Sequence, residues 1–233
     1  MLEQEALHVE PSAEAGERAV RAEHAMARQH DRQRVADYNP QVLRESIEAL
    51  ARAAELRERN GTGHGEMVAR YSELVARALG LSPEDVDDIA YAARAHDVGK
   101  IFVPDRVINK SGPLTEDEYY LVKLHAEVGA KILGTIPGGG PLREAVEHHH
   151  EAFDGSGYPA GLRGEKIPLW ARILSIADAY VNMTTEHSFA SAKSSEQALT
   201  ELERLSGIRY DGMLVRILAR ELKSERAPSS LGG

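Results

Sequence analysis

The sequence predicts an all-α protein, and three observations support that class. Runs in which apolar and polar residues alternate, the pattern of half-buried strands, are nearly absent. Apolar residues instead recur at helical spacing from residue 41 onward. Helix-capping signals stand before several of these stretches, at Ser82-Pro83, at Thr115 with Glu118, and at Ser194 with Gln197.

The elements follow in a simple order along the 233 residues. Residues 1–40, rich in Ala, Arg, Glu and Gln, form an arm with two open interpretations: a mobile segment, or a helix that pairs with another chain, as in a homodimer, or passes on a signal. Residues 41–226 form the domain, and residues 227–233 a disordered tail. Asp154–Pro168, with four glycines and two prolines, is expected to be a loop. The expected helices cover residues 41–60, 63–80, 84–97, 115–133, 141–151, 169–186, 195–206 and 211–223.

Composition excludes several classes of protein. There is no apolar run of about 18 residues that could span a membrane, and the acidic start has no apolar core of a secretory signal. The absence of cysteine excludes disulfides and thiolate metal sites and fits a cytoplasmic location. The net charge of −9 argues against a nucleic-acid polymer as partner, so an anionic ligand needs a locally positive pocket.

The ten histidines are the unusual feature of the composition. Five expected helices each place His or Asp at a position that the apolar pattern reserves for the core, as His125 lies between Leu121 and Val128. A single buried histidine is usually bonded to a carbonyl, but adjacent buried pairs are costly without partners. Divalent metal ions remove that cost, because imidazoles and carboxylates are their ligands. The candidate ligands are His64, His96, Asp97, His125, His149, His150 and Asp178.

Two strings of residues resemble a known family. His96-Asp97-Val98-Gly99-Lys100 and the run HHEAFDGSGYP over residues 149–159 are similar to the HD-GYP phosphodiesterases of the HD phosphohydrolase superfamily. The second string matches the family pattern HHExxDGxGYP at every fixed position. The resemblance spans residues 45–225 and implies an HD-domain helical bundle with a dinuclear metal centre.

The resemblance also implies how two divalent ions, iron or manganese, would be held. A trinuclear branch of the family carries Glu four residues before the first ligand, where this chain has Asn60, so two ions are expected. Asp97 would bridge them. One ion would be bound by His64, His96, Asp97 and Asp178, and the other by Asp97, His125, His149 and His150.

The implied reaction is hydrolysis of a 3′–5′ phosphodiester of cyclic di-GMP to the linear dinucleotide, with GMP as a further product. Asp97 and Lys100 are the implied catalytic residues, Lys100 by stabilising charge on a phosphate oxygen; a solvated helix end is the alternative role for Lys100. Lys100, Lys110 and Arg163 are the expected substrate contacts. The residues expected to support the ligands or order the loop, which is also a candidate surface for a protein partner, are Glu151, Asp154, Gly155, Gly157, Tyr158 and Pro159.

One segment departs from the family pattern. His187 and Ala190 stand where the family commonly has two arginines that hold substrate phosphates. Losing such arginines removes strong charge-assisted contacts. Three interpretations therefore stay open: a cyclic-dinucleotide phosphodiesterase, a slow or inactive metal-containing module that binds nucleotide or a partner protein, and a hydrolase of another phosphoester.

Overall fold

The structure is a computed structural model that describes residues 39–58, 63–186 and 191–226. The chain divides into two units, Met1–Leu43 and Arg44–Gly233. All but the first five described residues belong to the second unit. The predicted tail and almost all of the predicted arm lie outside the described residues, so the predicted domain boundaries stay predictions.

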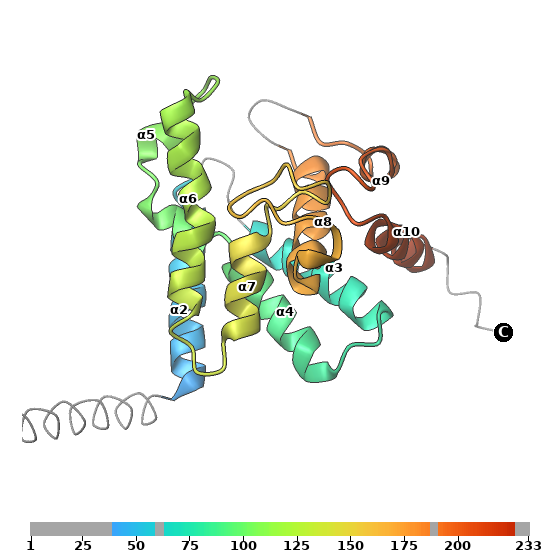
Figure 1. The fold of residues 1–233 in the computed structure, drawn as a ribbon, viewed down its shortest axis with the longest axis horizontal. Helices are drawn as coiled ribbons and strands as arrows, with labels where there is room; N and C mark the ends of the chain where they lie inside the picture. The colour runs from blue at the N-terminus through green and yellow to red at the C-terminus, as the bar shows by residue number, and fades with distance from the viewer. Residues whose placement is uncertain (1–38, 59–62, 187–190, 227–233) are drawn as a thin grey trace, which may run out of the picture. The chain divides into compact units, whose positions relative to one another are not determined.

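The described residues form α-helices and short 3₁₀ segments, with no strand, so the all-α class is confirmed. Figure 1 shows how the helices pack around one another. In chain order the elements are α2 (Pro40–Glu55), α3 (His64–Ala78), α4 (Pro83–Ala95), η1 (Val98–Phe102), α5 (Asp105–Ile108), α6 (Glu116–Leu133), α7 (Gly140–His148), η2 (Gly164–Lys166), α8 (Leu169–Thr184), α9 (Ser195–Arg204) and α10 (Gly212–Arg226).

The caps that the sequence predicted are present. The Ser82 hydroxyl accepts a hydrogen bond from the Asp85 amide at the start of α4. Complete capping boxes, headed by Thr115 and Ser194, begin α6 and α9. Each cap satisfies backbone donors that a helix leaves unpaired at its first turn. These caps explain why three helices begin within a residue of their predicted starts.

Six of the predicted helices end before their predicted last residue, and two of these ends matter for the site. The helix expected over 84–97 stops at Ala95, so that His96 caps α4 and Asp97 precedes η1. The helix expected over 141–151 stops at His148. A side chain on Gly99 would lie 2.0 Å from the His125 carbonyl oxygen, so only glycine lets η1 lie this close to α6.

The core joins the helices that supply the candidate ligands. Helix α3 packs on α4 and α8, α7 packs on α4, α6 and α8, and α9 and α10 pack on α8. Fully buried side chains fill these contacts, among them Ile89, Leu133, Leu142, Ile173 and Leu218. This close packing fixes the positions of the helix ends that carry histidine and aspartate.

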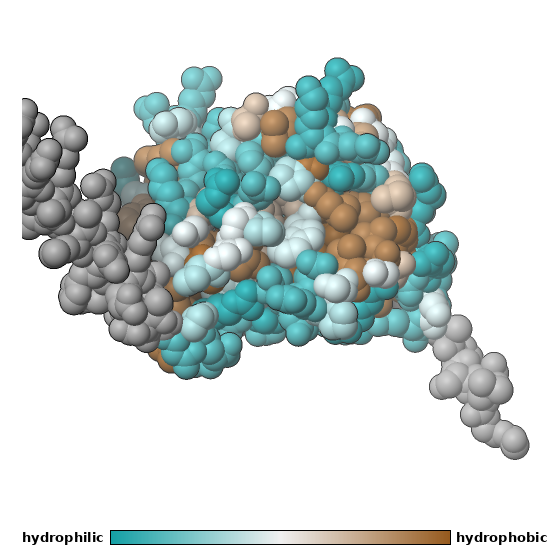
Figure 2. Space-filling model, turned by 60° about the horizontal axis from the view of Figure 1, so that its bottom comes forward, coloured by the Kyte–Doolittle hydropathy of each residue, from teal (hydrophilic) through white to brown (hydrophobic). Residues whose placement is uncertain are grey.

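The outer surface of the described residues is mixed. Figure 2 shows a largely hydrophilic face on which one apolar area stands out. Large apolar side chains are also exposed, including Leu56, Phe102 and Tyr120. None of the described helices has both the length and the apolar character needed to cross a membrane.

Candidate metal centre

All seven predicted metal ligands lie together in the structure. They form three overlapping groups, and within each group one ligand atom per residue lies within 4.8 Å of the others. We call His64, His96 and Asp178 the acidic group, and His125, His149 and His150 the imidazole group. His96, Asp97 and His149 form the third group, which joins the other two.

Asp97 lies between the acidic and imidazole groups. Its Oδ2 atom is 3.2 Å from His96 Nε2, and its Oδ1 atom is 3.4 Å from His125 Nε2. In the acidic group, Asp178 Oδ1 is 3.0 Å from His64 Nε2 and 3.9 Å from His96 Nε2. The two oxygens of Asp97 therefore face different groups, as a bridging carboxylate requires.

Three histidine rings are held in one orientation by their own helices. The Nδ1 atoms of His96, His125 and His149 lie 2.7, 2.6 and 2.7 Å from backbone carbonyl oxygens three residues earlier. A carbonyl can only accept, so each Nδ1 carries the hydrogen and donates it. The neutral ring then turns its Nε2 lone pair toward the centre, the form in which histidine binds metals. The acceptors are the carbonyls of Ala93, Val122 and Val146.

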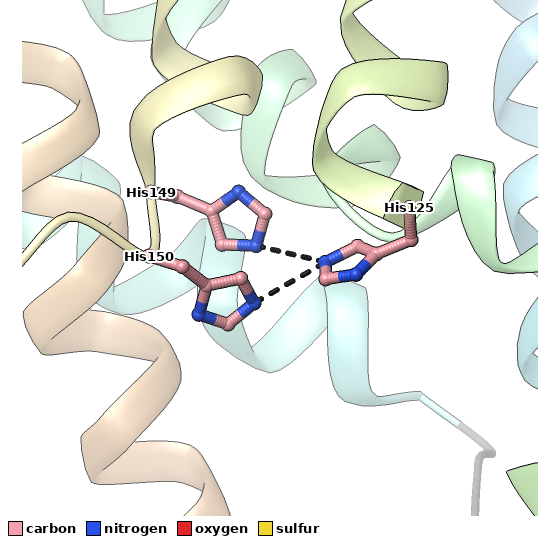
Figure 3. A group of neighbouring side chains, drawn as sticks. All are labelled: His125, His149 and His150. Atoms are coloured by element: carbon pink, nitrogen blue, oxygen red, sulfur yellow. Dashed lines mark hydrogen bonds between the residues drawn. The ribbon is translucent and has the colours of Figure 1, made fainter. Parts of the chain in front are cut away.

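The imidazole group has a contact that favours a bound cation. His125 Nε2 lies 3.4 Å from His149 Nε2 and 3.2 Å from His150 Nε2 (Figure 3). Because Nδ1 of both His125 and His149 already donates to a carbonyl, two lone pairs face each other when these rings are neutral. A divalent ion between them would replace that repulsion by two bonds, so the residues present fit a metal ion.

The pKa values favour the neutral, ligand form of the imidazole group. Burial, with the neighbouring histidines, holds the pKa of His149 well below its ordinary value. Burial and the nearby His125 lower the pKa of His150 to about 4. Burial also lowers the pKa of His125, against the attraction of Asp97.

The acidic group has the opposite electrostatics. Burial alone would lower the pKa of His96, but the carboxylates of Asp97 and Asp178 outweigh it and raise that pKa to about 9. Burial likewise opposes ionisation of Asp97, yet His96 and Lys100 hold its pKa well below the usual range. An ion bound here must displace the His96 proton, so its affinity depends on pH.

Lys100 is the cation beside the centre. Its Nζ atom lies 2.7 Å from Asp97 Oδ2 and 2.9 Å from Glu58 Oε1. Burial would lower the pKa of Lys100, but these two carboxylates raise it, so the ammonium stays charged. Arg57 fixes the segment that carries Lys100, because its guanidinium donates to the carbonyls of Lys100, Ile101 and Val103.

The loop after the histidine pair is organised by Glu151. This buried carboxylate accepts hydrogen bonds from the amides of Ala160 at 2.7 Å and Leu162 at 3.0 Å. The neighbouring His148 turns toward it, with Nδ1 3.5 Å from Glu151 Oε1, and His148 belongs to none of the three ligand groups. A side chain on Gly157 would lie 2.1 Å from the Ala152 amide nitrogen, so the loop closes only around glycine.

The rest of the loop forms the rim of the centre. The Tyr158 ring stacks on His150, with ring centroids 4.9 Å apart, and Pro159 follows. Asp154 accepts two hydrogen bonds from Ser156, at 2.9 Å from its amide and 2.7 Å from its hydroxyl. Gly155, beside them, has a φ of +87°, a conformation that glycine adopts freely.

Comparison with known proteins agrees with this geometry. A model of the family described as HD domain matches residues 48–214. The chain belongs to the HD domain family. The resemblance to HD-GYP phosphodiesterases of the HD phosphohydrolase superfamily is thereby confirmed, as is the HD-domain helical fold.

Two relatives and one solved structure of similar fold are informative for this HD domain. The chain is 39% identical over 184 residues to the cyclic di-GMP phosphodiesterase response regulator RpfG of Xanthomonas campestris, and the match covers 76% of this chain and 47% of that protein. The chain is 35% identical over 180 residues to 3′3′-cGAMP-specific phosphodiesterase 2 of Vibrio cholerae, and this match covers 76% of this chain and 34% of that protein. The chain therefore spans less than half the length of these two curated relatives. A solved structure of similar fold is that of Bd1817, an HDG"Y"P protein from Bdellovibrio bacteriovorus, with a TM-score of 0.59 at 19% sequence identity. The superposition covers 79% of this chain and 65% of that one, so the two proteins share a fold.

A cavity of about 400 Å³ adjoins the centre of this HD domain. His150 and Asp178 form part of its lining, and two cations, Lys193 and Arg209, form another part. Sequence reasoning missed both cations, because they lie in connections without a motif. It missed Glu58 and Arg57 as well, since their partners on η1 are far along the chain.

None of the three predicted substrate contacts, Lys100, Lys110 and Arg163, is among the described residues that line this cavity. Lys110 is paired with Glu118 at 2.5 Å. Arg163 is exposed in the loop near Gly155. His187 and Ala190, the positions of the missing arginines, lie outside the described residues.

Proposed function

We propose that this HD domain is a metal-dependent phosphodiesterase that hydrolyses a 3′–5′ phosphodiester of cyclic di-GMP to the linear dinucleotide, with GMP as a further product. One observation carries the proposal. Two groups of metal-ligating atoms meet at Asp97, and a cavity opens directly on His150 and Asp178. Such a paired site beside a cavity suits displacement at a phosphodiester.

The proposal assigns two divalent ions, iron or manganese, to the ligands predicted from the sequence. The acidic group with Asp97 would hold one ion, and the imidazole group with Asp97 the other. Bound there, the ions would lower the pKa of a water molecule and offset charge on the reacting phosphoryl group. The carbonyl-bonded rings of His96, His125 and His149 keep their Nε2 atoms aimed at these positions before any ion arrives.

Lys100 supplies fixed positive charge to the reacting phosphate. Glu58 and Asp97 hold its ammonium from two sides, and Arg57 holds the backbone of η1. A charge positioned before the reaction stabilises developing negative charge without reorganisation. Asp97 and Lys100 are therefore the catalytic residues of the proposal, and Glu58 and Arg57 position Lys100.

The substrate class follows from the relatives. The Xanthomonas relative is named for cyclic di-GMP and the Vibrio relative for 3′3′-cGAMP, both cyclic dinucleotides. We assign cyclic di-GMP because the relative named for it is the more similar of the two. The cytoplasmic location, a protein partner at the loop over residues 154–159 and a homodimer formed through the arm stay predictions.

The test is hydrolysis by purified, metal-loaded protein. Cyclic di-GMP should give linear dinucleotide, at a higher kcat/KM than 3′3′-cGAMP gives its product. The variants Asp97→Asn and Lys100→Met should lose product formation, while Lys131→Ala, at an exposed position of α6, should not. No product from either dinucleotide at full metal occupancy would overturn the proposal and favour a binding module.

A further inference from the structure

The lining of the cavity beside the metal centre contains two cations. His150 and Asp178 belong to the centre, whereas Lys193 precedes α9 and Arg209 follows it. The volume of about 400 Å³ falls within the range of small-molecule sites. The chain thus brings two positive charges to a space that also opens on the metal ligands.

The carboxylates and the cations of the cavity lining differ in whether they have partners within the protein. Glu151 accepts two loop amides, Asp178 contacts His64, and Glu201 is paired with Arg204 at 2.7 Å. The charge of Lys193 also acts on Glu201, whose pKa is lowered mainly by its hydrogen bond with Arg204. Within the part of the chain that the structure describes, neither Lys193 nor Arg209 has an ion-pair partner. The three carboxylates of the lining therefore already have partners within the protein, whereas the two cations can bind an anion.

Both cations stand on backbone that is tied to the site. The Lys193 amide donates to the Met183 carbonyl of α8 at 2.8 Å. The Arg209 carbonyl accepts from the Phe153 amide at 3.1 Å, in the loop that follows the ligands. These bonds hold the two segments against α8 and against the loop, which limits how far the cations can move from the centre.

We infer that Lys193 and Arg209 bind the second phosphate of a cyclic dinucleotide, the one that is not cleaved. This inference rests on the proposed function. A cyclic dinucleotide carries two phosphodiesters in one ring, so placing one at the metal centre holds the other nearby. Two cations without an ion-pair partner among the described residues line the adjoining cavity and match that second charge.

The inference predicts an effect on binding rather than on the chemical step. A contact to a phosphate that does not react is made equally in the bound substrate and in the transition state, so its loss raises KM and leaves kcat nearly the same. Because both cations are exposed to solvent, added salt should weaken the contact.

The experiment compares Lys193→Ala, Arg209→Ala and the double variant with the parent and with Lys131→Ala. Calorimetry with a slowly cleaved phosphorothioate analogue of cyclic di-GMP gives Kd for the metal-loaded protein. Each single variant should weaken binding about three- to tenfold and the double variant about 10- to 100-fold. Lys193→Arg should retain most of the affinity, and the control should change by less than about twofold.

A second substrate separates this site from the metal centre. Bis(p-nitrophenyl) phosphate has a single phosphate, so its hydrolysis reports on the centre alone. The double variant should lose much less of that activity than of its kcat/KM for cyclic di-GMP. Equal losses with both substrates would show that the cations act on the centre or the fold, which overturns the inference.

The remaining outcomes distinguish the two proposals. If the parent binds and cleaves cyclic di-GMP while the double variant keeps the parent's Kd, the second-phosphate site is wrong and the proposed function stands. If the parent neither binds the analogue nor cleaves cyclic di-GMP, the proposed function fails and the inference fails with it.

Discussion

The acidic and imidazole groups both bury histidines, but the groups that surround these histidines differ. In the acidic group, His64 and His96 lie beside carboxylates, and the raised pKa of His96 lets it hold a proton among them. The imidazole group has no carboxylate of its own, and its facing nitrogens carry lone pairs. The acidic group can therefore neutralise itself without a metal ion, whereas the facing lone pairs of the imidazole group favour a bound cation.

Asp97 connects the two groups, and its removal should have the largest effect. Asp97→Ala should empty both metal positions, because the two oxygens of Asp97 face different groups. The loss of metal affinity should exceed the roughly 100-fold effect of removing an outer partner of a ligand. His64→Ala should weaken one position preferentially. Elemental analysis of both variants checks this, and equal, small losses would contradict the bridging role.

Removing the metal should destabilise the protein. At pH 7.5 a chelator should lower Tm, since an ion at about 1,000 times its Kd contributes about 4 kcal/mol to the free energy of unfolding. The facing nitrogens of His125 and His149 indicate that most of this effect arises in the imidazole group. A Tm that is the same with and without chelator would show that the ions do not hold the fold together.

The two groups should give the metal-free protein opposite pH dependences. His150, with a folded-state pKa of about 4, takes up its proton more readily when unfolded, so the free energy of unfolding falls as pH drops from about 6.5 to 4. His96, with a pKa of about 9, holds its proton more tightly when folded, so its contribution is complete below about pH 6.5 and is lost as pH rises to 9.

Denaturant unfolding of chelated protein across this pH range measures both slopes. Each histidine contributes up to about 1.4 kcal/mol per pH unit within its window. His150→Gln should flatten the acid side of the profile and His96→Gln the alkaline side. A profile in which both variants change the same side would show that the two groups are electrostatically alike.

The smallest predicted effect concerns the support of Lys100. Glu58→Gln keeps the shape of the side chain but removes one of the two charges that hold the ammonium. We expect kcat for cyclic di-GMP to fall about tenfold or less, with the metal content of the parent, since one charged contact is lost. An altered metal content would instead place Glu58 among the groups that determine metal binding.

The sequence predicted the helices well because their signals are local. Apolar spacing and the caps at Ser82, Thr115 and Ser194 depend only on nearby residues. The candidate ligands were found because each interrupts an apolar face. The helix ends at Ala95 and His148 could not be predicted in this way, because they depend on contacts between distant segments, such as Gly99 against the His125 carbonyl.

The surroundings of the ligands were predicted less well for the same reason. Glu58 meets Lys100 only because folding brings the segment after α2 next to η1. Lys193 and Arg209 reach one cavity from the two ends of α9, and neither lies in a motif. Lys110, chosen from the sequence as a substrate contact, is paired with Glu118, an acid eight residues later.

The metal content of the unmodified protein tests the central claim most directly. Elemental analysis of anaerobically purified protein should find close to two divalent ions per chain, because in the proposed centre the acidic and imidazole groups each hold one and share Asp97. A metal content near zero under the same conditions would contradict the claim that these residues form a metal centre. A content near one ion per chain would show that the two groups do not form a paired centre.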